Sequence, residues 1–228
     1  CIHLYKNDSS YYLFKKHGFT NNYCIENSCD YVFFNHDTNA EIAEKYGIHS
    51  PYFIQVANYD ENKNQLFTVK AFLEANIQNF DLVFIGSQKN SYYNTLIEYV
   101  ESIDIEHQKR IHFMTAIERE DVVKLIKNCY ACLLSSHSEY FPISIVEGMA
   151  SKKPFISTSV GEVPKFCGGH IVRTVAEMSY WMNYYALNKE YVELMGEEAG
   201  RFAKKNMWLQ DKIDAFEAVI LSCKEGGR

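Results

Sequence analysis

Short apolar runs alternate with longer amphipathic stretches along this chain from residue 52 onwards. Such runs are typical of strands buried on both faces of a parallel sheet, and the amphipathic stretches are typical of the helices that cover it. Six strands are expected, at residues 52–57, 81–85, 111–114, 130–135, 155–158 and 170–172.

The stretches between these runs carry apolar residues at helical spacing. The pattern predicts a doubly wound, Rossmann-like α/β fold, with a parallel sheet of about six strands flanked by helices. Ligands of such folds bind outside the carboxyl ends of the strands. The residues at helical spacing are Leu66, Val69, Leu73 and Ile77, then Tyr93, Leu96, Val100 and Ile103, then Val122, Leu125 and Cys129.

The two ends of the chain follow other patterns. After residue 172 the pattern is helical only, with helices expected at 175–187, 191–204 and 210–221 and a frayed tail at 224–228. Residues 1–50 predict a strand at 2–5, a helix at 11–16 that ends at Gly18, a strand at 23–26 and a helix at 40–46. These elements do not make a complete domain. Because the chain begins at Cys1 without an initiator Met or a signal-peptide pattern, we expect a fragment of a longer protein.

Composition and charge exclude several classes of protein. Apolar residues make up 47% of the 228 positions, which is typical of a globular domain and excludes a disordered chain. The net charge is −6 without any long basic block, so we expect no binding to nucleic acid. No apolar run reaches the roughly 18 residues that a membrane-spanning helix needs.

The seven cysteines stand at irregular spacings, which indicates a reducing compartment and a cytoplasmic protein rather than a disulfide framework. Cys129 and Cys132 form a C-x-x-C pair without the second ligand pair that a structural zinc site needs, so we expect both thiols in the core. The eight histidines show no metal-binding spacing, and Asp60 and Glu61 are expected in a solvated loop. We therefore predict no metal site.

The segment from Ser136 to Ala150 holds the richest group of polar residues, directly after the apolar run at 130–135. Pro142 suits the first position of a helix, where its fixed φ and missing N–H cost nothing. The amides of Ile143, Ser144 and Ile145 would then lack partners at the positive end of the helix dipole. The sequence therefore predicts an anion site that fits a diphosphate.

Two glutamates flank this predicted anion site. Glu139 lies in the loop before the helix, and Glu147 lies about a turn and a half inside it. Two carboxylates beside a phosphate site suit a ligand with a hydroxylated ring at each end of a diphosphate, as in a nucleotide sugar. The spacing alone leaves the alternative that Glu139 caps or solvates the loop and that Glu147 is an exposed helix residue.

Residues 136–162, SHSEYFPISIVEGMASKKPFISTSVGE, resemble the E-x7-E signature of the family 4 (group 1) retaining glycosyltransferases. That signature begins approximately S-x-x-E-G-F-P-x-x-x-x-E-A-M-A-x-G-x-P. The resemblance implies one half of a GT-B fold, the donor-binding half of two Rossmann-like domains that face each other across a cleft. It extends over nearly the whole chain, through residues 24–34, 54–64, 82–86, 111–117 and 202–208.

The resemblance also implies roles for individual residues. Glu139 would lie beside the transferred sugar, and Glu147 would hold the nucleotide ribose. Lys63 corresponds to a phosphate-binding lysine whose charge offsets the negative charge of the departing diphosphate, so Lys63 and Glu139 are the expected catalytic residues. The other expected donor-binding residues are Phe141, Pro142, Ile143 and Ser144 at the helix start, and Asn58, Gly86 and Ile117, the last through main-chain groups that read the base.

Four positions depart from the family pattern. Asn58 stands where the family usually has a phosphate-binding Arg, so the site lacks one positive charge, and catalytic strength and donor type stay open. Tyr140 replaces a common Gly and is expected to narrow the sugar pocket. Gly148 replaces an Ala, and Lys152 replaces a Gly and is expected at the surface.

By the resemblance, the chain is part of an enzyme that moves a sugar from a UDP-sugar or GDP-sugar to a saccharide or lipid-linked acceptor, with retention. Residues 1–20 would be a remnant of the acceptor-binding domain, 21–205 the nucleotide-sugar-binding domain, and 206–228 a helix that crosses back toward the absent half. On its own the chain is not expected to transfer sugar. No cofactor besides the donor substrate is expected, and a peripheral association of the full-length enzyme with a membrane is left open.

Two alternatives stay open at this point. One is a nucleotide-sugar epimerase of similar fold, and the other is a nucleotide-sugar-binding domain with weakened catalysis, which the loss of the Arg at Asn58 motivates. A further expectation concerns the last helix, whose Ile213, Phe216 and Ile220 would lie partly exposed and favour self-association.

Overall fold

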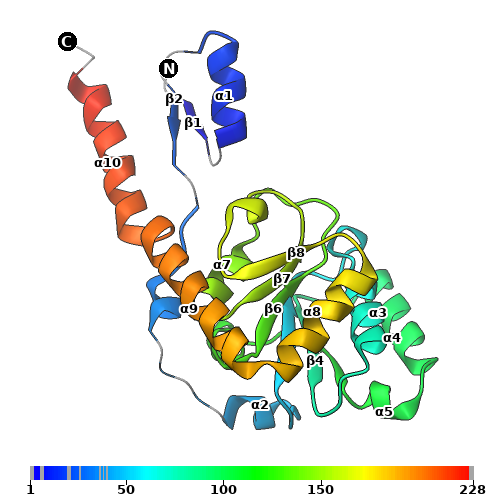
Figure 1. The fold of residues 1–228 in the computed structure, drawn as a ribbon. Helices are drawn as coiled ribbons and strands as arrows, with labels where there is room; N and C mark the ends of the chain where they lie inside the picture. Colours follow the sequence, from blue (N-terminus) through cyan, green and yellow to red (C-terminus); the bar gives the residue numbers. More distant parts are fainter. Residues whose placement is uncertain are drawn as a thin grey trace.

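The computed structural model describes residues 3–5, 8–19, 22–25, 27–35, 37, 39 and 41–225. Its centre is a six-stranded parallel sheet with the strand order β5-β4-β3-β6-β7-β8 (Figure 1). The strands are β3 (Tyr52–Val56), β4 (Asp81–Gly86), β5 (Ile111–Thr115), β6 (Ala131–Leu134), β7 (Phe155–Thr158) and β8 (Gly169–Val172).

The strand order reverses at β3, which pairs with β4 on one side and with β6 on the other. Phe53 lies opposite Leu82 of β4 and opposite Ala131 of β6. The loops that follow β3 and β6 therefore leave the same edge of the sheet at the point where the topology switches. In open α/β sheets this crevice is the usual place for a ligand.

Helices cover both faces of the sheet (Figure 1). One core lies between the sheet and helices α6 (Arg119–Asn128), α7 (Ile143–Ala150) and α9 (Lys189–Asn206), and the other between the sheet and helices α3 (Gln65–Ala75), α4 (Ser91–Glu101) and α8 (Val175–Leu187). Successive strand residues alternate between the two cores, so Ile54 belongs to the first and Phe53 to the second. A short helix, α5 (Ile105–Gln108), precedes β5.

The first part of the chain forms a small parallel pair, β1 (His3–Tyr5) and β2 (Asn22–Cys24), joined by helix α1 (Asp8–Lys16). Gly18 has a φ of 85°, the left-handed conformation that ends a helix readily at glycine. A connector with the short helices η1 (Tyr31–Phe34) and α2 (Glu41–Lys45) leads to β3, and helix α10 (Leu209–Glu225) closes the chain.

The strand and helix predictions are confirmed, with small shifts at the element ends. The strand at 155–158 and the helix at 175–187 have the expected bounds. The strand expected at 130–135 is shorter and covers Ala131–Leu134; the Ser135 hydroxyl that follows it lies near the carbonyl groups of Lys63 and Asn64. The frayed tail is wrong at its beginning, since α10 continues to Glu225. Residues 2, 26, 40 and 226–228 of the expected elements lie outside the described residues.

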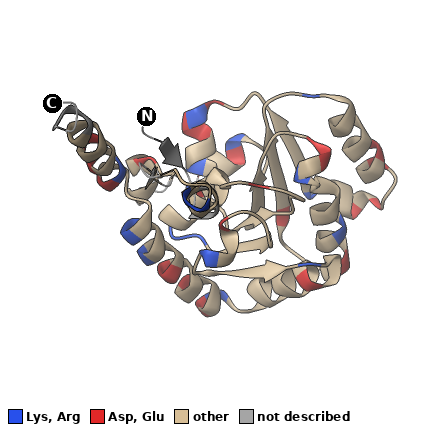
Figure 2. Ribbon diagram, turned by 90° about the horizontal axis from the view of Figure 1, so that it is seen from above, with Lys and Arg blue, Asp and Glu red and all other residues tan. Residues whose placement is uncertain are grey.

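Cys129 and Cys132 are buried with their sulfur atoms 3.7 Å apart, as the expectation of core thiols requires. Among the described residues, no three or more His, Cys, Asp and Glu side chains are grouped to hold a metal ion. In the same part of the chain no helix combines the length and apolar character needed to cross a bilayer. Basic and acidic residues are mixed over the outer helices (Figure 2).

Candidate functional site

Two loops meet at the carboxyl ends of β3 and β6. The amide of His137 donates to the carbonyl of Asn62 at 2.8 Å, and the Asn62 side-chain amide donates to the carbonyl of Ser138 at 2.9 Å. These two hydrogen bonds join the loop after β3 to the loop after β6. Residues far apart in the sequence are therefore held in one site.

A buried polar network supports this junction from below. The Gln55 side-chain amide donates to the carbonyl of Lys63 at 3.1 Å, and Thr68 Oγ1 donates to Gln55 Oε1 at 2.7 Å. Ser135 Oγ lies 2.9 Å from the carbonyl oxygen of Lys63 and 2.8 Å from that of Asn64. Because buried polar groups need partners, these contacts fix the backbone that carries Lys63.

Lys63 and Glu139 form the central ion pair, with Lys63 Nζ 2.5 Å from Glu139 Oε1. Ser136 Oγ donates to the same oxygen at 2.7 Å. Both charged side chains are partly shielded from solvent, which strengthens their attraction relative to an exposed pair. The two expected catalytic residues are therefore in direct contact, and Glu139 does not serve only to solvate its loop.

The start of α7 differs in detail from its prediction. Pro142 has a φ of −77° and a ψ of 98°, so it caps the helix, and Ile143 is the first helical residue. The amide of Ile145, expected to lack a partner, donates to the Pro142 carbonyl at 3.2 Å, because the cap turns that carbonyl toward the first turn. Among the described residues, the amides of Ile143 and Ser144 find no acceptor, so two unpaired N–H groups remain for an anion.

Glu147 is a buried carboxylate, with 5% of its surface exposed. Burial raises the pKa of its carboxyl group, and Arg119, whose Nη2 donates to Glu147 Oε1, lowers it. The alternative of an exposed helix residue is thus excluded. Sequence reasoning missed Arg119; its position at the start of α6, after β5, is the signal that could have found it.

The other expected donor-binding residues lie along the same edge of the sheet. Asn58 is exposed in the loop after β3, and its carbonyl accepts a hydrogen bond from Gln65 Nε2 at 2.8 Å. Ile117 is half-buried in the loop after β5. The ring of Phe141 is buried against Phe166, 5.8 Å between centroids, so only main-chain groups of Phe141 could face a ligand.

Gly86 ends β4, directly beside the ring of Tyr59. A Cβ at Gly86 would overlap that ring, and the Tyr59 hydroxyl is in turn fixed by donation to the carbonyl of Met114 at 2.8 Å. Glycine is therefore required at this strand end by packing within the chain.

Three of the departures from the family pattern have distinct local surroundings. A Cβ at Gly148 would overlap the Cys132 sulfur, so Gly148 and Cys132 fit each other. Lys152 is exposed, as expected, but has a φ of 57°, a conformation that favours glycine, and its ammonium group lies 2.8 Å from Glu197 Oε1. Tyr140 is exposed on the loop beside Gly161, whose missing side chain leaves room for the Tyr140 carbonyl.

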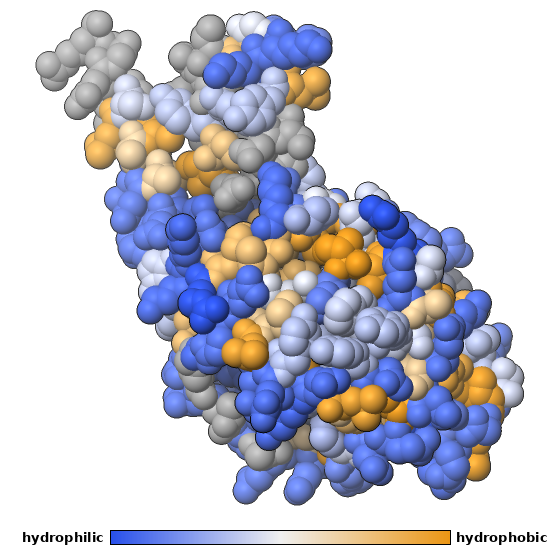
Figure 3. Space-filling view, viewed as in Figure 1, coloured by the Kyte–Doolittle hydropathy of each residue, from blue (hydrophilic) through white to orange (hydrophobic). Residues whose placement is uncertain are grey.

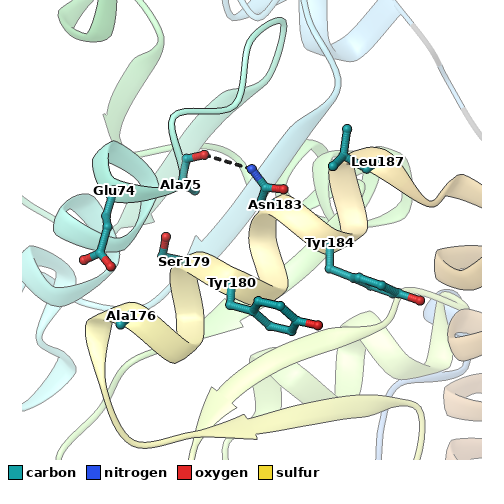
Figure 4. Close-up of a pocket in the computed structure, with 8 residues that line it drawn as sticks. All are labelled: Glu74, Ala75, Ala176, Ser179, Tyr180, Asn183, Tyr184 and Leu187. Atoms are coloured by element: carbon teal, nitrogen blue, oxygen red, sulfur yellow. Dashed lines mark hydrogen bonds between the residues drawn. The ribbon is translucent and has the colours of Figure 1, made fainter.

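Two surface hollows differ in their relation to this group of residues. One, of about 350 Å³, lies between α3 and α8, where Asn183 donates to the carbonyl of Ala75 (Figure 4). It contains none of the predicted site residues. The other, of about 600 Å³, is lined by Arg119 together with Asp30, Asn35 and Lys124.

Comparison with known proteins shows what this architecture is similar to. The family model of "Glycosyl transferases group 1" matches residues 38–182. The HepE protein of Anabaena, solved in complex with UDP and glucose, superposes with a TM-score of 0.84 at 15% identity, over 97% of this chain and 63% of that one. The C-terminal domain of LpcC, a group 1 glycosyl transferase from Francisella tularensis, superposes with a TM-score of 0.69 at 16% identity, over 78% of this chain and 97% of that domain.

A curated relative shows a shorter similarity in sequence. The D-rhamnosyltransferase WbpZ of Pseudomonas aeruginosa is 36% identical over 64 residues, which is 27% of this chain and 17% of WbpZ. This chain thus spans less than two thirds of the length of HepE and of WbpZ. The family match covers more than half of the chain, including the Lys63–Glu139 pair and the start of α7, so the chain belongs to the group 1 glycosyl transferases.

Proposed function

We propose that this chain is the donor-binding half of a retaining transferase that moves a sugar from a nucleoside diphosphate sugar to a saccharide or lipid-linked acceptor. The contact between Lys63 and Glu139, 76 positions apart in the sequence, is the observation that carries this proposal. It brings a cation and a carboxylate together at the topological switch of a fold whose relatives transfer sugars.

The diphosphate would bind at the start of α7. The unpaired amides of Ile143 and Ser144 lie at the positive end of the helix dipole, where their N–H groups can donate to a phosphate. Lys63 adds a full positive charge on the other side of the loop. Negative charge builds on the diphosphate as the bond to the sugar breaks, and a fixed cation and fixed amides stabilise that charge without reorganising.

The two glutamates would serve opposite ends of the donor. Glu139 follows β6 and contacts Lys63, so it belongs with the sugar and the scissile bond. Glu147 projects from inside α7, and its Oε2 accepts no hydrogen bond from any described residue, so this oxygen is available to a ribose hydroxyl. The UDP and glucose of the HepE complex favour a UDP-sugar as the donor to test first.

The proposed domain organisation follows the same reasoning. Residues 21–205 would bind the donor, residues 1–20 would belong to the acceptor-binding half, and 206–228 would cross back toward it. We expect the 228-residue chain to bind nucleotide and to transfer no sugar, because the acceptor and part of the catalytic cleft come from the other half. Sugar transfer by this chain alone, measured by product analysis, would contradict that organisation.

The test of the proposal separates the two glutamates. In the complete enzyme, Glu139→Gln should lower kcat with little effect on the Kd of free UDP, whereas Glu147→Gln should weaken UDP binding by roughly 1–3 kcal/mol. Free UDP lacks the transferred sugar, so only the ribose contact registers in its Kd. Glu98→Gln, a substitution on the exposed side of α4, is the matched control and should change neither quantity.

Four outcomes would contradict the proposal or part of it. Unchanged UDP affinity in Glu147→Gln removes the ribose assignment, and equal losses in both variants remove the division of roles. If the complete enzyme epimerises the sugar of the donor instead of transferring it, the protein is an epimerase. A complete enzyme that binds UDP tightly and never turns over indicates that Asn58, in place of Arg, has weakened catalysis.

A further inference from the structure

Glu147 and Arg119 form an ion pair outside the predicted catalytic pair. Arg119 Nη2 donates to Glu147 Oε1, and the guanidinium carbon lies 5.2 Å from the centre of the Phe33 ring. Phe33 is fully buried on η1. The guanidinium therefore contacts an aromatic face from the connector and a carboxylate from α7, and these contacts orient it although 59% of the Arg119 side chain is exposed.

The surroundings of Glu147 do not favour its charge without Arg119. Burial raises the pKa of the Glu147 carboxyl, and the charge of Asp30 acts in the same direction. The charge of this carboxylate also acts on the thiols of Cys29 and Cys132. The pKa of Cys29 is about 12, mainly because of burial, and that of Cys132 is raised well above its usual value, first by its hydrogen bond with Cys129 and then by burial. Both thiols are thus neutral near pH 7. Among the described residues, Arg119 is the one cation in contact with the carboxylate.

The two carboxylate oxygens of Glu147 have different surroundings. Oε1 accepts from Arg119, whereas Oε2 accepts no hydrogen bond from the described residues, and 7% of the Glu147 side-chain surface is exposed. A carboxylate in this state can accept hydroxyl hydrogen bonds with Oε2 while Oε1 stays anchored. A protonated carboxyl would offer a weaker acceptor and would donate instead.

We propose that Arg119 is a positioning residue for the nucleotide, which keeps Glu147 ionised and holds Oε2 toward the ribose hydroxyls. This inference rests on the proposed function, because it assumes that Glu147 contacts the ribose. Arg119 itself needs no contact with the donor. Its removal should therefore act on the ribose end of the ligand and leave the phosphate end unchanged.

The test measures binding of UDP, 2′-deoxy-UDP and inorganic pyrophosphate by calorimetry at about pH 8 and about pH 6. Arg119→Gln should weaken UDP binding at both values and more at the lower one, since the pKa of the Glu147 carboxyl rises further without the guanidinium and more of it is then protonated at the lower pH. The terminal phosphate of UDP also titrates near pH 6, so the quantity compared is the ratio of variant to wild-type affinity at each pH. Arg119→Lys should restore part of the loss.

Pyrophosphate and 2′-deoxy-UDP localise the effect. Pyrophosphate has no ribose, so its affinity should be the same in wild type and in Arg119→Gln, and the penalty for removing the 2′-hydroxyl should shrink in the variant. Lys124→Gln is the matched control, because it removes one positive charge from the same helix and the same hollow. It should leave the UDP affinity and its pH dependence as in the wild type.

The outcomes separate this inference from the function on which it rests. If the wild type binds neither UDP nor another nucleoside diphosphate, the proposed function fails. If the wild type binds UDP, and Arg119→Gln binds it equally well at both pH values or loses pyrophosphate affinity to the same extent, only the role of Arg119 is overturned. Should that variant not fold, a carboxyl-carbon NMR titration of the wild type decides, because a protonated Glu147 at pH 7 contradicts the inference.

Discussion

At the scale of single residues, Gly148 and Cys132 show how two side chains constrain each other. A methyl group at Gly148 would overlap the Cys132 sulfur inside a buried helix. We expect Gly148→Ala to lower the free energy of unfolding by about 1–3 kcal/mol, the usual cost of overpacking, despite a gain of roughly 1 kcal/mol in helix propensity.

Urea unfolding of a double-mutant cycle checks this expectation. Cys132→Ala in the same chain makes room for the new methyl group, so the double variant should recover stability relative to the sum of the single ones. Strictly additive effects, or a Gly148→Ala variant more stable than the wild type, would show that the two positions do not compete for space.

Lys152 is the second residue whose backbone conformation matters. Its φ of 57° is unfavourable for a side chain with a Cβ, and its ion pair with Glu197 is at the surface. Because left-handed backbone costs a lysine roughly 1–2 kcal/mol and an exposed ion pair contributes about 0–1 kcal/mol, Lys152→Gly should stabilise the protein by up to about 2 kcal/mol. Thermal unfolding measures the change, and Glu197→Gln isolates the part due to the ion pair.

At the scale of elements, β8 joins α8 and α9 through one histidine. The His170 ring stacks on Trp181 of α8 at 3.3 Å between centroids, and its Nε2 lies 3.0 Å from the Tyr191 hydroxyl of α9. Burial lowers the pKa of His170 to about 4. The folded protein thus holds this imidazole neutral, whereas the unfolded chain binds a proton near pH 6.5.

The sign of the resulting pH dependence follows from linkage. The stabilisation is fully present above about pH 6.5 and is lost as the pH falls toward 4, because the unfolded chain binds the proton first. We expect His170→Gln to lose less stability than the wild type between about pH 7 and about pH 5, as measured by urea midpoints. Parallel curves for the two proteins would mean that His170 does not contribute to acid sensitivity.

The helices and strands were the features of this protein that the sequence predicted best. The parallel strands are buried on both faces, so continuous apolar runs mark them, and α8 has the bounds that the helical pattern predicts. The start of α7 was displaced by one residue, because the ψ of Pro142 depends on the loop before it. The contact between Arg119 and Glu147 joins different elements, so the position of Arg119 after β5 could indicate a site residue but not its partner.

At the scale of the whole molecule, α10 presents an apolar face to solvent. Figure 3 shows hydrophobic residues on this helix among hydrophilic ones, and 45% of the Phe216 surface is exposed, beside the similarly exposed Ile213 and Ile220. Burying such a face is favourable by about 25 cal/mol per Å² of apolar area. We expect this chain to self-associate through α10.

Sedimentation velocity over a concentration series checks this expectation. Phe216→Lys should shift the chain toward monomer, whereas Leu194→Lys, at another exposed apolar position with 68% exposure, should leave the association unchanged. Equal effects of both substitutions would indicate nonspecific hydrophobic association, and a monomeric wild type would exclude self-association through α10.

The contact between Lys63 and Glu139 also has a kinetic consequence, because the chain between them must be closed into a loop of 76 positions. Long loops close at an entropic cost that grows with their length, and parallel strands pair slowly for the same reason. The pairing of β3 with β6 brings these two loops together, so the nucleotide site cannot form before that pairing. During refolding, nucleotide binding should therefore appear only with the last cooperative phase. The signal of a fluorescent nucleotide would then report the fraction of molecules in which β3 has paired with β6.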